Sequence, residues 1–180
     1  EHAKDERLST TGRAMTCVGI FRNAKTNKKA RGLHVSFPCQ STTVLGDHMR
    51  SLRQPRGKDG ITATQREFCD SQNVLLDFGI ECLWAAFRSN ISVTGEFPCF
   101  RGAKGVPPKR AYWEAKEDYA TVEHFKEFKS FMVASGARLF RFAGCGLGFK
   151  SQKYLSVVAW PNSTAKVFDH LDGLECAHVN

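Results

Sequence analysis

The spacing of the cysteines is the feature that most constrains the fold of this chain. Seven cysteines are spread along 180 residues, and no two have the close spacing that zinc fingers and ribbons use to present paired sulfurs to one ion. We therefore predict no structural metal site. Scattered cysteines are typical of disulfides, which persist in oxidising compartments, so we predict a secreted, extracellular protein. The candidates for disulfide formation are Cys17, Cys39, Cys69, Cys99, Cys145 and Cys176.

The odd number of cysteines leaves at least one thiol outside any intramolecular disulfide. Cys82 lies in the apolar stretch 78–87, and buried thiols behave as small hydrophobic side chains. We therefore predict that Cys82 is the unbridged cysteine. The pairing of the other six cannot be read from the sequence and stays open.

Composition predicts a globular chain. Hydrophobic residues make up 42% of the sequence, enough to bury a core, and we expect residues 1–180 to form one compact unit. The segment 101–109, with its glycines and the Pro107-Pro108 pair, is the best candidate for a boundary between two lobes. No stretch of about 18 apolar residues occurs, so no membrane span is predicted. The chain begins with a polar segment, so secretion would require that a leader has been removed.

The net charge of +8 favours anionic partners such as nucleic acid, with simple solubility as the alternative explanation. Basic residues gather in three runs, 22–31, 50–58 and 101–110, each containing residues typical of exposed loops. The first two runs supply the candidate binding residues, which are Arg22, Lys25, Lys28, Lys29, Arg31, Arg53, Arg56 and Lys58.

Hydrophobic periodicity predicts an α+β fold, rich in β-structure, with a mostly antiparallel, disulfide-stabilised sheet. Period-two alternation and β-branched residues predict strands at 14–22, 33–37, 91–98, 110–113, 154–160 and 165–171. The main helix is predicted at 118–135, with Val122, Phe125, Phe128 and Met132 on one face and Gly136 after its end.

Two further segments have helical features. Thr64 and Glu67 resemble a capping box and predict a short helix at 62–70, whereas 74–87 fits neither a helix nor a strand cleanly. Two sequons, at Asn90 and Asn162, predict N-glycosylation in a eukaryotic secretory pathway, and Asn162 is the better candidate because it follows Pro161.

The sequence lacks a phosphate-binding glycine loop, a His-Glu-x-x-His helix and a Gly-x-Ser-x-Gly turn, and no cofactor is predicted. One segment carries a resemblance. Gly95-Glu96-Phe97-Pro98-Cys99-Phe100, followed by a basic glycine- and proline-rich stretch and then 107–112, resembles fungal guanyl-preferring ribonucleases and ribotoxins.

That resemblance implies a metal-independent endoribonuclease. It implies that Glu96 is the general base, Arg110 the phosphate ligand and His124 the acid, with His34 as a second histidine. A carboxylate can take a proton efficiently only where a nearby cation orients the phosphate, so the set is chemically sensible.

As a class, the chain also resembles secreted, cysteine-containing effectors of plant-pathogenic fungi. This resemblance implies that the protein acts by binding a host or extracellular protein, and that it can act inside a host cell after secretion. RNA or another polyanion is a further candidate partner because of the net charge. We take binding of a macromolecule as the predicted function and endoribonuclease activity as the alternative.

Overall fold

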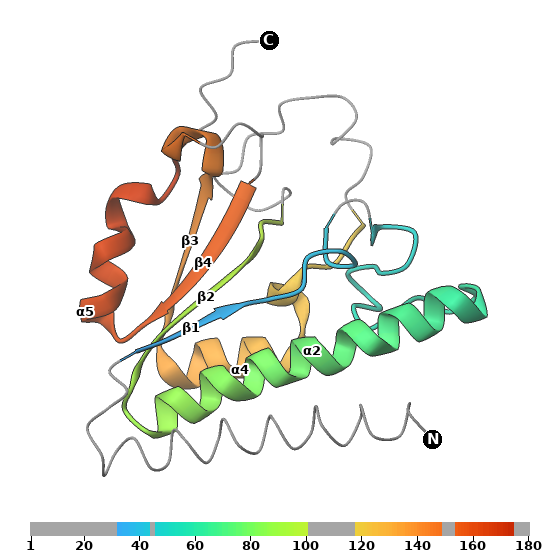
Figure 1. Cartoon of the computed structure of the whole chain (residues 1–180), viewed down its shortest axis with the longest axis horizontal. Coiled ribbons are helices and arrows are strands. Elements are labelled where there is room, and N and C mark those ends of the chain that lie inside the picture. The colour runs from blue at the N-terminus through green and yellow to red at the C-terminus, as the bar shows by residue number, and fades with distance from the viewer. Residues whose placement is uncertain (1–31, 44–45, 101–117, 149–153, 175–180) are drawn as a thin grey trace.

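The computed structural model describes residues 32–43, 46–100, 118–148 and 154–174 (Figure 1). Several predictions concern residues outside these ranges. They are the strands at 14–22 and 110–113, the boundary at 101–109, and the residues Cys17, Cys176, Arg110, Arg22, Lys25, Lys28, Lys29 and Arg31.

A four-stranded sheet forms the centre of the described fold. Its strands are β1 (Gly32–Ser36), β2 (Ser92–Pro98), β3 (Arg138–Ala143) and β4 (Tyr154–Trp160), in the order β1-β2-β4-β3. β1 pairs with β2 in parallel, whereas β4 pairs with both β2 and β3 antiparallel. The α+β class is confirmed, but the sheet is mixed rather than antiparallel. A helical crossover separates β1 from β2, and such a connection returns the chain in the parallel direction.

That crossover is α2 (Ala63–Arg88), a helix of 26 residues. It merges the short helix predicted at 62–70 with the ambiguous segment 74–87. The capping box exists, but Thr62 and Gln65 form it, two residues before the predicted pair. Gly79 lies where the helix crosses β1: a Cβ there would come within 2.6 Å of the Phe37 ring. Only glycine permits this close approach without displacing the ring.

The helix predicted at 118–135 is shorter than expected. A 3-10 turn, η2 (Val122–His124), is followed by α4 (Lys126–Ser135), because Phe125 has an extended backbone that interrupts the helix. The predicted apolar face is nevertheless correct: Val122, Phe125 and Phe128 are at most 1% exposed. Gly136 ends the helix in the left-handed conformation, as predicted.

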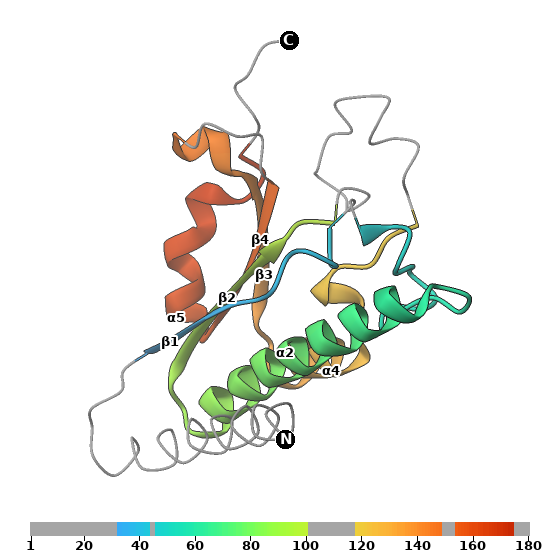
Figure 2. The ribbon, with the colours of Figure 1, turned by 45° about the vertical axis from the view of Figure 1, so that its right-hand side comes forward.

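The sheet lies between two helical layers (Figures 1 and 2). α2 and α4 cover one face, while α5 (Asn162–Ala165) and the 3-10 helix η4 (Lys166–Leu171) lie against the other. The strand predicted at 165–171 is therefore wrong. Ala165, Phe168 and Leu171 recur every three residues and pack towards the sheet, which is a helical period. None of the described helices has the length and apolar character needed to cross a bilayer.

The prediction of a disulfide-stabilised fold is wrong for the described part of the chain. Cys39 and Cys69 carry free thiols, and no disulfide joins any two of the five described cysteines. Cys69 and Cys82 are at most 5% exposed, and both lie within α2. Packing of aromatic rings supplies much of the core instead: Phe37, Phe97 and Phe128 meet edge to face.

Candidate functional site

Within the part of the chain that the structure describes, helical segments cover the second face of the sheet over β3 and β4 alone. Ala165 and Phe168 pack on Phe140 and Ala159, over β3 and β4. On β1 and β2 the same face carries Ser92, at the start of β2, and four further polar side chains. His34 and Ser36 are exposed, and Thr94 and Glu96 are half-buried. We call this set of four residues, His34, Ser36, Thr94 and Glu96, the open sheet face.

The side chains of the open sheet face are arranged around the imidazole of His34. Its Nδ1 lies 2.8 Å from Thr94 Oγ1, and its Nε2 lies 3.3 Å from Ser36 Oγ. The parallel register pairs His34 with Thr94 and Ser36 with Glu96. Glu96 is therefore diagonal to His34 on the neighbouring strand, and side chains in this relation are within reach of a common ligand.

This arrangement combines a carboxylate, an imidazole and two hydroxyl groups on one accessible surface. A carboxylate and an imidazole can serve as base and acid when both reach the reacting atoms. The hydroxyls bond to both ring nitrogens and so fix the orientation of the His34 ring. Among the described residues, no group of three or more His, Cys, Asp or Glu side chains is placed to hold a metal ion.

The structure brings two of the predicted catalytic residues, Glu96 and His34, to one face and places His124 on the other. His124 belongs to a hydrogen-bond network that includes Arg141 on β3. Arg141 pairs in the sheet with Ser156 of β4, and Ser156 pairs in turn with Phe97 of β2. Neighbouring residues of a strand point to opposite faces. Glu96 and His124 therefore lie on opposite sides of the sheet, and Arg110 lies outside the described residues.

His124 has a different environment. The backbone N–H of Thr121 donates to His124 Nδ1 at 3.1 Å, and the Thr121 hydroxyl lies 3.2 Å from the same atom. Thr121 also bonds to Glu123, which pairs with Arg141. Burial lowers the pKa of His124 below its ordinary value. A neutral ring that accepts a bond from Thr121 at Nδ1 fits this position, and the network secures the start of α4.

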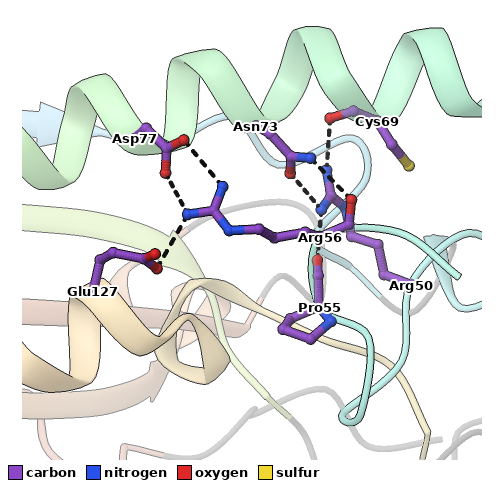
Figure 3. Close-up of polar contacts among 7 residues, drawn as sticks. All are labelled: Arg50, Pro55, Arg56, Cys69, Asn73, Asp77 and Glu127. Carbon is purple, nitrogen blue, oxygen red and sulfur yellow. Dashed lines mark hydrogen bonds and ion pairs between the residues drawn. The ribbon is translucent and has the colours of Figure 1, made fainter.

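The basic run 50–58 contains no helix or strand, as predicted for a loop, but two of its arginines make contacts within the fold. The Arg56 guanidinium lies 2.7 and 3.0 Å from the two carboxylate oxygens of Asp77 on α2, and 3.1 Å from Glu127 on α4 (Figure 3). It also lies 5.2 Å from the centre of the Phe125 ring. The hydrogen bond with Asp77 raises the pKa of Arg56. Arg56 thus links the two helices.

Arg50 is fully buried, which the sequence did not indicate. Its guanidinium donates to Asn73 Oδ1 at 2.8 Å and to the carbonyls of Pro55 and Cys69 (Figure 3). Burial lowers its pKa. Of the three candidate binding residues in this run, Arg53 is exposed, Lys58 is half-buried and Arg56 is held by its ion pairs.

Charge is distributed unevenly between the described fold and the rest of the chain. Residues 32–43, 46–100, 118–148 and 154–174 hold 11 Lys and Arg and 12 Asp and Glu, a net charge of −1. The remaining residues hold 15 basic and six acidic side chains, a net charge of +9, which accounts for the total of +8. The basicity of this protein therefore comes from sequence outside the described fold.

Both predicted glycosylation asparagines are exposed. Asn162 is the first residue of α5, and Asn90 follows α2 with a φ of 54°. Exposure is compatible with glycosylation at either asparagine and does not separate the two.

No protein family, curated protein or solved structure matches this chain.

Proposed function

We propose that the protein acts by binding an anionic macromolecule, and that this macromolecule is single-stranded RNA. The observation that carries the proposal is the uneven charge: a nearly neutral described fold accompanies segments with a net charge of +9. Clustered cations attract phosphate backbones and release their counterions. The largest such segment, 1–31, is joined to the start of β1, and 101–117 follows the end of β2. β1 and β2 are the strands that carry the four residues of the open sheet face.

RNA is favoured over an acidic protein by the side chains of the open sheet face. His34, Ser36 and Thr94 offer imidazole and hydroxyl groups that can bond to ribose hydroxyls, phosphates and base edges. The carboxylate of Glu96 repels an acidic peptide and an RNA phosphate alike, so the preference for RNA rests on the imidazole and hydroxyl groups.

Salt dependence of binding tests this proposal. Changing Arg22, Lys25, Lys28, Lys29 and Arg31 together to Gln should weaken binding of a labelled single-stranded RNA. It should also reduce the slope of log affinity against log salt by up to about 3.5, at ~0.7 for each phosphate that the protein no longer neutralises. Lys126→Gln with Lys129→Gln, both exposed on α4, is the matched control and should leave the slope unchanged.

Absence of binding at low salt would refute the proposal. An equal loss in the α4 control would also contradict it, because net charge alone would then explain the attraction. If polyglutamate displaced the RNA at equal charge concentration, the preference for RNA would be refuted and an acidic protein partner would replace it.

A second candidate function, metal-independent cleavage of RNA, is favoured by one observation: Glu96 and His34 occupy the same exposed face. In this reaction Glu96 accepts the proton of a ribose 2′-hydroxyl while the 2′-oxygen attacks phosphorus. Protonated His34 donates a proton to the departing 5′-oxygen, and a 2′,3′-cyclic phosphate remains. Each proton transfer of this kind contributes about 10²–10⁴-fold to the rate.

Incubation of labelled RNA with the protein and a metal chelator tests the cleavage. Glu96→Gln and His34→Asn should each lower the rate by at least about 100-fold, while Ser92→Ala, also on β2, should have no effect. RNA binding measured on the same variants should persist. Retained binding without cleavage in the unmodified protein would reject the enzyme and leave the binding function standing.

Secretion and action on a host or extracellular macromolecule remain predictions. The cysteines support secretion less than the sequence suggested, because no disulfide joins the described cysteines to one another. The class resemblance to secreted effectors now supports them, and the RNA-binding proposal does not depend on the compartment.

A further inference from the structure

We propose that the protein forms a homodimer in which the edge strand β1 pairs antiparallel with β1 of a second copy. β1 stands at one end of the strand order and has β2 as its one neighbour among the described strands. A strand in this position presents a row of backbone N–H and C=O groups with which another chain can pair. Formation of this dimer does not depend on RNA binding.

The two edges of the described sheet differ. The outer side of β3, at the other end of the strand order, is closed by residues that follow η4. The backbone N–H of Arg141 donates to Asp172 Oδ1 at 3.0 Å, and the Arg141 carbonyl accepts from the N–H of Gly173 at 2.8 Å. No strand of the described residues pairs with the outer side of β1. β1 also contains neither lysine nor proline, the residues that commonly block pairing at an edge.

The hydrogen bonds to β2 determine which residues of β1 face a partner. The N–H of Phe37, just after β1, donates to the Glu96 carbonyl at 3.0 Å. Backbone groups alternate in direction along a strand, so the odd-numbered residues of β1 bond towards β2 as well. The N–H and carbonyl groups that point to the outer edge are therefore those of Gly32, His34 and Ser36.

β1 is complementary to itself about a two-fold axis beside His34. His34 then faces the partner's His34, and Gly32 faces the partner's Ser36, so that each opposed pair exchanges two backbone hydrogen bonds. Leu33 falls opposite the partner's Val35, which gives one apolar pair on each side of the axis. Leu33 and Val35 pack against the main core cluster but are only half-buried in one copy, and the second β1 covers their outer side.

This self-complementarity favours a second copy over an unrelated chain. The side chains of β1 carry no lysine, arginine or carboxylate by which a different partner could be selected, whereas the two-fold arrangement opposes apolar to apolar positions throughout. Four strands from each copy then form one continuous sheet. Because opposed residues of an antiparallel pair point to the same face, the two open sheet faces lie side by side.

The mass of the full chain in solution tests the dimer. Sedimentation equilibrium of nuclease-treated protein without RNA should give an average mass that rises with concentration towards twice that of one chain. The series should extend to about 100 μM, where a dimer with a dissociation constant of that value is half formed. The mass of a single chain throughout the series would overturn the proposal, whatever the outcome of the RNA-binding measurements.

Charges at Gly32 and Ser36 test the register. Both residues are exposed, and a Cβ at Gly32 meets the Ser92 carbonyl oxygen at 3.6 Å, an ordinary contact. Gly32→Lys with Ser36→Lys places like charges opposite each other across the axis, as does Gly32→Glu with Ser36→Glu, so each double variant should stay monomeric. An equimolar mixture of the two should restore the dimer, because lysine then faces glutamate at both pairs.

Ser130→Lys with Ala134→Lys is the matched control, because it adds the same charge at exposed positions of α4. This control should form the dimer as the unmodified protein does. Circular dichroism checks that every variant is folded. A dimer that persists in the two charged β1 variants, a mixture that stays monomeric, or a control that loses the dimer would each overturn the pairing.

Discussion

Arg50 and Arg56 provide a direct test of whether burial decides what a basic residue contributes to stability. Both come from the same basic run, and both contact Phe125, at 5.8 and 5.2 Å from its ring centre. Arg50 is 0% exposed, whereas the side chain of Arg56 is 41% exposed. We expect Arg50→Met to destabilise the protein by about 3–5 kcal/mol and Arg56→Ala by about 1 kcal/mol.

The magnitudes follow from the groups that each substitution leaves behind. Without the guanidinium of Arg50, the Cys69 carbonyl loses a donor at a buried position, and Asn73 Oδ1 and the Pro55 carbonyl lose donors at partly buried positions. Each unsatisfied acceptor costs about 1–3 kcal/mol, partly offset because a desolvated charge is removed. Removal of the Arg56 side chain leaves two carboxylates, those of Asp77 and Glu127, that water can solvate. Screened pairs of this kind contribute about 0–1 kcal/mol, and the cation–π contact adds about 0.5–1 kcal/mol.

Urea unfolding followed by circular dichroism measures both substitutions. With a typical m-value of about 2 kcal/mol per molar, Arg50→Met should move the midpoint by about 1.5–2.5 M and Arg56→Ala by about 0.5 M. Arg53→Ala, at an exposed position of the same run, is the control and should not move it. Equal midpoints for the Arg50 and Arg56 variants would refute the reasoning that burial, rather than the number of contacts, sets the effect.

Three further changes test the core and the His124 network. Phe128→Asp places a carboxylate where the side chain is 1% exposed and should unfold the protein, as seen by loss of a cooperative thermal transition. Gly79→Ala should lower the unfolding free energy by about 1–3 kcal/mol in urea titrations despite a better helix former, because the new Cβ meets the Phe37 ring at 2.6 Å. The pKa of His124 is lowered by burial, so the unfolded chain binds the extra proton more readily. The stability that the neutral His124 ring contributes should be complete above about pH 6.5 and should be lost as pH falls through the pKa of the folded state. His124→Gln should make the unfolding free energy measured in urea less dependent on pH over this range.

Three of the four strands could be predicted from the sequence because local alternation determines them. The segment 154–160 matches β4 residue for residue, and 33–37 and 91–98 match β1 and β2 to within one residue at each end. α2 was harder to recognise because Val74 and Leu75 are apolar but exposed, and so lie outside the face that the helix buries. Most of its buried residues, at 69, 72, 76, 79, 80, 83 and 86, recur at the three- and four-residue spacing of a helix.

The open sheet face could be predicted only in part. Glu96 and His34 came from a resemblance, but the sequence did not show that β1 and β2 pair in parallel. That register places Ser36 beside Glu96 and Thr94 beside His34. Once two strands are assigned, period-two alternation does show that residues 34 and 36 share a face, as do 94 and 96. The partner strand and its offset are tertiary information, and so Ser36 and Thr94 were missed.

Cleavage of RNA depends on RNA binding, whereas binding does not depend on cleavage. Binding draws on the charge outside the described fold, so it should survive substitution of Glu96 or His34. Cleavage needs both a bound phosphate and the open sheet face, so it cannot outlast the loss of binding. Variants in the basic segment should therefore lower affinity and cleavage together, whereas variants at Glu96 should separate them. A Glu96→Gln protein that lost RNA affinity as completely as cleavage would show that the carboxylate organises the site rather than acts as its base.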